Sequence, residues 1–160
     1  MGIVRMGPPI EIIIQLKEVY NIPIFVETGT YYGETAYWAS KVFEKVITIE
    51  YSSKIYKTVT EKYGGIKNIE FMFGDSRSML VDIADKLDTS AIFWLDAHWS
   101  GGATYGEIDQ CPLIKEIEII NNTGGEHFIF IDDARGFLSP PPLPNSIDIG
   151  PNITDSSFAS

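Results

Sequence analysis

Acidic side chains follow five short apolar runs of this 160-residue chain, each at the point where the run ends. Carboxylates gathered at one place bind cationic groups, accept hydrogen bonds from sugar hydroxyls or coordinate a hard divalent ion. The acids are Glu27, Glu50, Asp75, Asp96, Asp132 and Asp133, and His98 stands two residues after Asp96. Histidine adds a group that exchanges a proton near neutral pH. If the five runs are parallel strands, all of these residues lie along one edge of a sheet.

The apolar runs have the character of strands that are buried on both faces. They are short, rich in β-branched and aromatic residues, and nearly free of polar alternation. The expected strands are 24–26, 46–49, 69–73, 91–95 and 128–131, and the expected helices are 10–19, 34–44, 52–63, 76–87 and 106–121. Ser52 and Ser76 stand where helix N-caps are expected. The alternation of strand and helix predicts an α/β fold with a doubly wound, mostly parallel sheet.

The segment Glu27-Thr-Gly29-Thr-Tyr31-Tyr-Gly33 joins the first expected strand to the next helix. Gly29 permits a sharp turn, and Gly33 is expected to let the helix pack close to the sheet with its N-terminal amides facing a ligand. The carboxylate of Glu27 would repel a pyrophosphate and attract an ammonium group, which argues against a dinucleotide. This turn is therefore predicted to bind a nucleotide-like ligand that carries positive charge.

Two later acids have alternative interpretations. Glu50 follows Gly29 by 21 residues, close to the spacing of ~20 at which a second-strand acid hydrogen-bonds ribose hydroxyls. Its alternative role is that of a solvated acid favoured by the dipole of the next helix. Asp75 either accepts a hydrogen bond from an adenine amino group or sits beside a helix N-terminus. Among the aromatic residues, Trp38 is expected in the core, whereas Tyr31 and Tyr32 are placed to line a pocket.

The chain resembles the class I S-adenosylmethionine-dependent methyltransferases, which have a Rossmann-like fold. The segment Glu27–Gly33 is similar to their first motif, with Tyr31 where a middle glycine is common. Glu50 matches their ribose-binding acid, and Gly74-Asp75-Ser76 resembles their adenine-binding segment. The resemblance covers about residues 8–135. It implies that S-adenosylmethionine is bound by Glu27, Gly29, Thr30, Gly33, Glu50, Asp75 and Ser76.

The second group of candidate residues comes from Asp96-Ala-His98 and Asp132-Asp133. Carboxylate oxygens suit Mg²⁺, and a histidine would extend the set toward Mn²⁺. The arrangement is similar to that of metal-dependent O-methyltransferases and of relatives known as cephalosporin hydroxylases. The resemblance implies a metal ion on Asp96, Asp132 and Asp133, with His98 and Asp96 as catalytic residues and His98 as the general base. The alternatives are a structural histidine and acids that cap helices.

The resembling family ends its sheet in two further strands, which have no convincing place after Asp133. Residues 146–153 are too few for both, so the sheet is expected to lack the usual C-terminal strand pair. An unpaired sheet edge would favour a homo-oligomer. Residues 1–138 are expected to form one Rossmann-like domain, and residues 139–160 a proline-rich loop and a polar tail.

The composition excludes several other classes of protein. A net charge of −10 disfavours sequence-independent binding to nucleic-acid phosphates. Cys111 is the only cysteine, and His98 and His127 are the only histidines, so the chain has no intrachain disulfide and no cysteine-histidine zinc framework. No stretch reaches the ~20 apolar residues of a membrane span, and no signal segment is visible. The cytoplasm is the expected compartment, and no membrane partner is expected.

The sequence therefore predicts methyl transfer from S-adenosylmethionine to a small-molecule hydroxyl, with Mg²⁺ as an accompanying hypothesis. The first alternative is a protein that binds or degrades S-adenosylmethionine without methylating an acceptor. A second is an NAD-linked oxidoreductase, although the turn has Gly-x-x-x-Gly and not Gly-x-Gly-x-x-Gly. A third is an interaction module that binds no small molecule.

Overall fold

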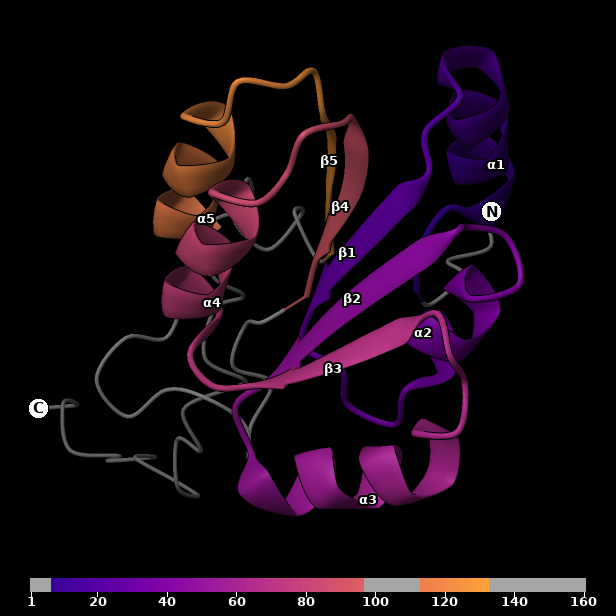
Figure 1. Ribbon diagram of the computed structural model, residues 1–160, viewed down its shortest axis with the longest axis vertical. Helices are drawn as coiled ribbons and strands as arrows, with labels where there is room; N and C mark the ends of the chain where they lie inside the picture. Colours follow the sequence, from indigo (N-terminus) through magenta and orange to yellow (C-terminus); the bar gives the residue numbers. More distant parts are fainter. Residues whose placement is uncertain (1–6, 97–112, 133–160) are drawn as a thin grey trace, which may run out of the picture.

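The computed structural model describes residues 7–96 and 113–132, in which strands and helices alternate (Figure 1). The strands are β1 (Ile24–Thr28), β2 (Lys45–Glu50), β3 (Ile69–Phe73), β4 (Ala91–Leu95) and β5 (Phe128–Ile131). The helices are α1 (Ile10–Tyr20), α2 (Glu34–Ala39), α3 (Ser53–Tyr63), α4 (Ser76–Ala84) and α5 (Leu113–Asn121). Each predicted strand is present, within two residues of its expected ends.

The sheet has the order β3-β2-β1-β4-β5, and every neighbouring pair is parallel. The chain reverses direction across the sheet after β3, so β1 and β4 lie side by side at the centre. In this register Glu27 is paired with Thr48 of β2 on one side and with Trp94 of β4 on the other. The predicted α/β class and doubly wound parallel sheet are confirmed.

Two apolar layers cover the sheet. Phe25 of β1 belongs to the layer beneath α1 and α2, together with Ile13 and Phe43. Val26, the next residue, points to the opposite layer beneath α4 and α5, with Leu80 and Ile120. Figure 1 shows α4 and α5 side by side, with α1 and α2 across the sheet from them. Because side chains alternate along a strand, Glu27 faces the α1–α2 side and Thr28 the α4–α5 side.

Two helices differ from the sequence prediction. Helix α2 ends at Ala39, five residues before the predicted end, because tight turns allow Phe43 to enter the core beside Phe25, with ring centroids 5.2 Å apart. Helix α4 ends at Ala84 and is capped by Asp75 rather than by Ser76. The prediction of Ser52 as the N-cap of α3 is confirmed, since its hydroxyl accepts a hydrogen bond from the Ile55 amide.

Several predicted features lie outside the described residues: His98, Asp133, the first part of the helix expected over 106–121, and the tail over 139–160. The expected loss of the C-terminal strand pair concerns the same region and stays a prediction. Within residues 7–96 and 113–132, no helix is long and apolar enough to cross a membrane.

Candidate functional site

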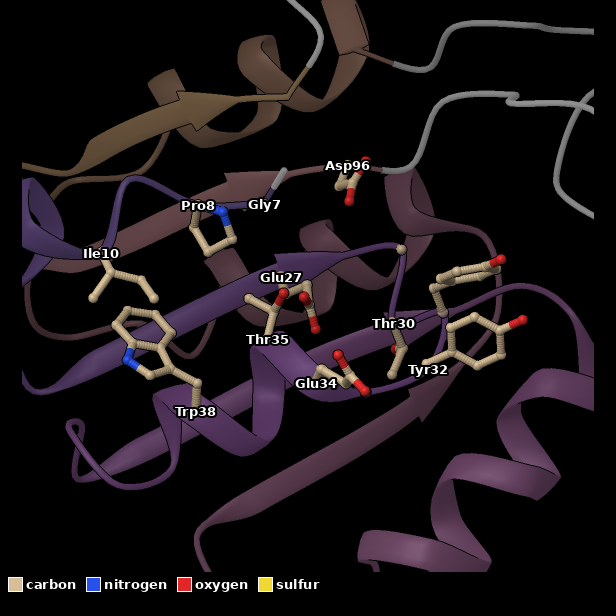
Figure 2. Close-up of a pocket in the computed structure, with 13 residues that line it drawn as sticks. Gly7, Pro8, Ile10, Glu27, Thr30, Tyr32, Glu34, Thr35, Trp38 and Asp96 are labelled. Atoms are coloured by element: carbon tan, nitrogen blue, oxygen red, sulfur yellow. The ribbon is translucent and has the colours of Figure 1, made fainter. Parts of the chain in front are cut away.

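Five of the six predicted acids stand at the carboxyl ends of the five strands. Glu27 and Glu50 are within β1 and β2, Asp75 follows β3, and Asp96 and Asp132 follow β4 and β5. Beside the β1 and β4 ends is a cleft of about 420 Å³, a size that suits a small ligand. Its lining comes from the start of α1, the β1–α2 turn, α2 and the β4 end (Figure 2): Gly7, Pro8, Ile10, Glu27, Gly29, Thr30, Tyr31, Tyr32, Gly33, Glu34, Thr35, Trp38 and Asp96.

The β1–α2 turn requires left-handed backbone at three positions. Gly29 has φ +85° and Gly33 has φ +73°, a conformation that glycine adopts without steric cost. Tyr31 is also left-handed, with φ +46°, and so a side chain occupies the position where the resembling family commonly has glycine. The amides of Gly29 and Thr30 both donate to the Ile49 carbonyl, at 3.0 and 3.1 Å, which ties the turn to the end of β2.

Gly33 is needed for a reason that differs from the predicted one. A Cβ at this position would lie 3.0 Å from the ring of Tyr63, at the end of α3. The close approach is therefore between the turn and a neighbouring helix rather than between α2 and the sheet. Tyr63 in turn stacks on Tyr37 of α2, with ring centroids 5.2 Å apart. The side chains of α2 and α3 meet here and leave no space for a larger residue at position 33.

Glu27 is a buried carboxyl group held by threonine hydroxyls. Its side chain is 1% exposed. The Thr48 hydroxyl donates to Glu27 Oε2 at 2.6 Å, and Thr30 Oγ1 lies 2.7 Å from Thr48 Oγ1. Figure 2 shows Thr35 of α2 beside the Glu27 carboxyl. Burial raises the pKa of Glu27 to about 8, and the negative charge of Asp96 adds to the rise, while hydrogen bonds from Thr48 and Thr35 oppose it.

The sequence suggested that Glu27 carries a permanent negative charge, and the raised pKa shows that this charge depends on what the cleft contains. With a pKa of about 8, Glu27 is mostly protonated at neutral pH when the cleft is empty. A cationic group placed beside it would stabilise the ionised form and lower the pKa. The cleft is thus suited to a cation, and binding of that cation would release a proton from Glu27.

Glu50 fixes the position of the turn through both carboxylate oxygens. Its Oε2 accepts from the Tyr31 amide at 3.0 Å, and its Oε1 accepts from the Ser52 amide at 2.8 Å. Each carboxylate oxygen retains a further lone pair for a ligand hydroxyl. The geometry is consistent with a ribose-binding acid, and it also gives Glu50 the second task of holding Tyr31 in its left-handed conformation.

Asp75 is turned toward Arg77, and Ser76 is buried beside it. Asp75 Oδ1 accepts from the Arg77 amide at 2.8 Å, and Oδ2 forms an ion pair with the Arg77 guanidinium at 2.7 Å. This is the helix-capping role that the sequence left open. Ser76 is the first residue of α4 and is buried, with 7% of its surface exposed. Any contact of the two residues with an adenine ring stays a prediction.

Asp96 and Asp132 extend two neighbouring strands. The Asp96 amide donates to the Thr28 carbonyl at 3.0 Å, and the Asp132 amide donates to the Leu95 carbonyl at 3.0 Å. Both therefore stand at the carboxyl ends of neighbouring strands, and Asp96 also lines the cleft. No group of three or more acidic, histidine or cysteine side chains in metal-binding arrangement occurs among residues 7–96 and 113–132. The other predicted metal and catalytic residues, Asp133 and His98, lie beyond those ranges.

The aromatic residues divide differently from the prediction. Tyr31 and Tyr32 line the cleft, as expected, with ring centroids 4.0 Å apart and more than half of each side chain exposed. Trp38 packs against the core layer with Phe25, as predicted, but it also lines the cleft, at the same end as Ile10 (Figure 2). The cleft thus combines carboxyl groups with flat apolar surface.

Sequence reasoning missed two polar residues of the site, Thr48 and Thr35, and also Glu116, a buried acid of α5. Thr48 is the one hydroxyl residue in the apolar run 46–49, which was an available signal. The significance of that hydroxyl depends on the register that pairs it with Glu27. Glu116 had no comparable signal, because acids are common on helices and only packing shows that this one is 1% exposed.

Comparisons with solved structures show where else this fold occurs. A Podospora anserina methyltransferase, PaMTH1, bound to S-adenosylhomocysteine, has a TM-score of 0.61 at 18% identity, over 89% of this chain and 62% of its own. A Staphylococcus aureus protein provisionally described as a caffeoyl-CoA O-methyltransferase has a TM-score of 0.56 at 17% identity, over 82% and 59%. An rRNA methylase from Streptococcus thermophilus has a TM-score of 0.51 at 19% identity, over 84% and 78%.

These similarities define the fold. The chain has the Rossmann-like fold of the class I S-adenosylmethionine-dependent methyltransferases. It spans about three-fifths of the length of the first two proteins compared, at 62% and 59%. No protein-family model and no curated protein sequence matches the chain.

Proposed function

We propose that this protein binds S-adenosylmethionine in the cleft beside β1 and transfers its methyl group to a small-molecule hydroxyl. The observation that carries the proposal is the pairing of two carboxyl groups across the β1–α2 turn. Glu27 is buried at the base of the cleft, and Glu50 holds the turn through the Tyr31 amide. The methyltransferase fold adds support, since S-adenosylhomocysteine is bound in the Podospora relative of that fold.

The residues of the turn suit the parts of such a cofactor. Glu50 has lone pairs for the ribose hydroxyls, and Gly29 leaves no Cβ between the backbone and the ligand. Glu27, once ionised, would balance the charge of the methionine ammonium group. Bound S-adenosylmethionine would supply a methyl group on a positively charged sulfur. Thr30 completes the set by its hydrogen bond with Thr48, which also binds Glu27.

The electrostatics of the cleft favour a neutral acceptor over an anionic one. Glu27, Glu34 and Asp96 line it, and no Lys or Arg does among the described residues. A phosphate group of a nucleic acid would meet these carboxyl groups as well as the chain's net charge of −10. The rRNA methylase of similar fold therefore does not indicate an rRNA substrate for this chain.

The proposed chemistry at the acceptor rests on the ends of β4 and β5. Asp96 and Asp132 stand on adjacent strands, where together with Asp133 they would hold a divalent ion such as Mg²⁺. Such an ion would lower the pKa of an acceptor hydroxyl and orient its oxygen. His98, two residues after Asp96, is the proposed general base.

Cofactor binding is tested by calorimetric titration of the protein with S-adenosylhomocysteine. Glu50→Ala is expected to weaken binding by at least about tenfold, because hydrogen bonds to a charged group contribute roughly 1.5 to 3 kcal/mol each. Glu61→Ala, at an exposed acid of α3, is the control and should bind as the wild type does. Equal affinity of Glu50→Ala and the wild type would exclude Glu50 from the site.

Methyl transfer is tested with S-adenosylmethionine labelled in its methyl group and a panel of catechols, phenols and sugars, with and without EDTA. We expect label in a hydroxyl compound and loss of most of the transfer when the metal is removed, with recovery on adding Mg²⁺. Transfer that is insensitive to EDTA would contradict the metal hypothesis alone. Breakdown of the labelled cofactor at the same rate without any acceptor would favour the alternative of a cofactor-degrading enzyme.

A further inference from the structure

A chain of hydrogen bonds joins the buried carboxyl group of Glu27 to two threonine hydroxyls. The Thr48 hydroxyl donates to Glu27 Oε2 at 2.6 Å, and Thr30 Oγ1 lies 2.7 Å from Thr48 Oγ1. Both distances are those of short O–H···O hydrogen bonds. Thr48 is 0% exposed, and Thr30 is 3% exposed. Glu27 and Thr30 both line the cleft, so Thr48 connects two lining residues from behind.

The backbone fixes the positions of the three residues. The register of β1 and β2 pairs Glu27 with Thr48. The Thr30 amide donates to the Ile49 carbonyl at 3.1 Å, and the Thr30 carbonyl accepts from the Gly33 amide at 2.8 Å. Thr30 is therefore held to β2 by its backbone as well as by its side chain. The contact between the two hydroxyls is thus part of the way in which the turn is attached to the sheet.

The direction of these hydrogen bonds is determined when Glu27 is ionised. An ionised carboxylate has no proton and only accepts, so Thr48 uses its single hydroxyl proton on Glu27. The contact between the two threonines then has Thr30 as its donor. Because its proton is directed to Thr48, the Thr30 hydroxyl can only accept hydrogen bonds from a ligand. The ionised form of Glu27 therefore gives this part of the cleft two acceptors, the carboxylate and the Thr30 oxygen.

Two neighbouring acceptors suit a ligand group that carries donors and positive charge. A primary ammonium group has three N–H donors, whereas a carboxylate or a phosphate dianion has none. Burial raises the pKa of Glu27, and the negative charges of Asp96 and Glu50 add to the rise. The hydrogen bond from Thr48 is the strongest effect that lowers this pKa. Thr48 thus favours the ionised carboxylate that an ammonium group needs as its partner.

We infer that Thr48 is a positioning residue that orients Glu27 and Thr30 so that both accept hydrogen bonds from a primary ammonium group of the ligand. The inference rests on the proposed function, because this group is taken to belong to the amino-acid part of S-adenosylmethionine. Thr48 is fully buried and does not line the cleft, so its effect passes through its two neighbours. A purely structural role would make Thr48 equally important for every ligand of the cleft. The inferred role concerns only ligands that carry the ammonium group.

The test compares two ligands by calorimetric titration. S-adenosylhomocysteine carries the ammonium group, and 5′-methylthioadenosine has the adenosine part without the amino-acid part. Thr48→Val keeps the shape of the side chain and removes the hydroxyl. It is expected to weaken S-adenosylhomocysteine binding by about tenfold, which is the loss of about one hydrogen bond to a charged group. Binding of 5′-methylthioadenosine should stay within about twofold of the wild type, because the adenosine part is bound by other residues.

Two matched variants separate the hydroxyl from other effects of the substitution. Thr48→Ser restores the hydroxyl and should bind S-adenosylhomocysteine within about threefold of the wild type. Thr58→Val, at an exposed threonine of α3, is the control and should bind both ligands as the wild type does. Retained binding of 5′-methylthioadenosine also shows that a variant is folded.

Thr30→Val extends the test to the second acceptor. It should weaken binding of S-adenosylhomocysteine and not of 5′-methylthioadenosine. The loss in the double variant with Thr48→Val should be smaller than the two single losses combined, because each hydroxyl acts through the other. If Thr48→Val does not fold, the comparison of the two ligands on Thr30→Val decides.

The outcomes distinguish this inference from the proposed function. Unchanged binding of S-adenosylhomocysteine by Thr48→Val, equal weakening of both ligands, or no recovery in Thr48→Ser would each overturn the role of Thr48 while the proposed function stands. If the wild type binds neither ligand, the proposed function fails and this inference fails with it.

Discussion

Replacing Glu27 with glutamine is expected to stabilise the protein at alkaline pH and to weaken cofactor binding at the same time. The pKa of Glu27 is about 8 in the folded protein, against 4.5 for a glutamate side chain in water. Because the pKa of Glu27 is higher in the folded protein than in the unfolded protein, its protonated form stabilises the fold. This stabilisation is complete below the pKa of the unfolded state and is lost as the pH rises to the pKa of the folded state. The wild type therefore loses stability from Glu27 between about pH 4.5 and pH 8, by an amount on the order of 4 kcal/mol.

Glutamine has no such dependence on pH, so the difference in unfolding free energy between Glu27→Gln and the wild type should grow across this range. Urea denaturation at pH 5, 7 and 8.5 measures the difference, and the contributions of other titrating groups, including Glu116, largely cancel. Glu34→Gln, at an exposed carboxylate of the same cleft, is the control and is expected to change stability by less than about 0.5 kcal/mol. A stability difference for Glu27→Gln that is constant with pH would show that Glu27 is not a titrating buried acid.

The same variant should bind S-adenosylhomocysteine at least about tenfold more weakly at pH 8, because the ligand ammonium group loses its counter-charge. A residue that weakens the fold while it serves binding is a recognised pattern at functional sites. Gain of stability together with loss of affinity would be the signature of Glu27 as a binding residue.

Replacing Gly33 with alanine is expected to be the most damaging single-methyl change in the β1–α2 turn. The left-handed backbone at φ +73° disfavours any L side chain, by roughly 1 to 2 kcal/mol. The added Cβ would also lie 3.0 Å from the Tyr63 ring, so a total loss of about 2 to 4 kcal/mol is expected once the ring is displaced. Gly65→Ala, where nothing lies within 4 Å of the added Cβ, is the matched control.

The two causes can be separated in a Tyr63→Ala background. There Gly33→Ala should cost only the backbone part, about 1 to 2 kcal/mol, and the difference from the wild-type background measures the contact with the ring. Urea denaturation of the four proteins gives this cycle. If Gly33→Ala is as stable as Gly65→Ala, the turn does not hold the left-handed conformation described for Gly33.

The sequence predicted the parts of the fold that depend on local pattern. Short β-branched runs indicated the strands, and their alternation with helical segments indicated the parallel sheet, because a buried strand and an amphipathic helix each have a clear signature. The placement of Glu27, Glu50 and Asp96 at strand ends followed directly. These acids are brought to one edge by topology alone.

The remaining features depend on contacts between residues distant in sequence. The hydrogen bond from Thr48 to Glu27 requires the register of β1 and β2, and the burial of Glu116 requires α5 to pack on α4. The early end of α2 is set by the entry of Phe43 into the core, which overrides the helical pattern through residue 44. Gly33 was predicted to allow a close approach between the following helix and the sheet. The residue that actually lies close to it is Tyr63, at the end of α3.

The central claim is that the cleft beside Glu27 and Glu50 is the binding site of S-adenosylmethionine. Its most direct test is a crystal structure of the protein grown with saturating S-adenosylhomocysteine. We predict density for the ligand with its ribose hydroxyls on Glu50 and its amino group beside Glu27, against the backbone of Gly29. A structure with this cleft empty, or with the ligand bound elsewhere, would contradict the account.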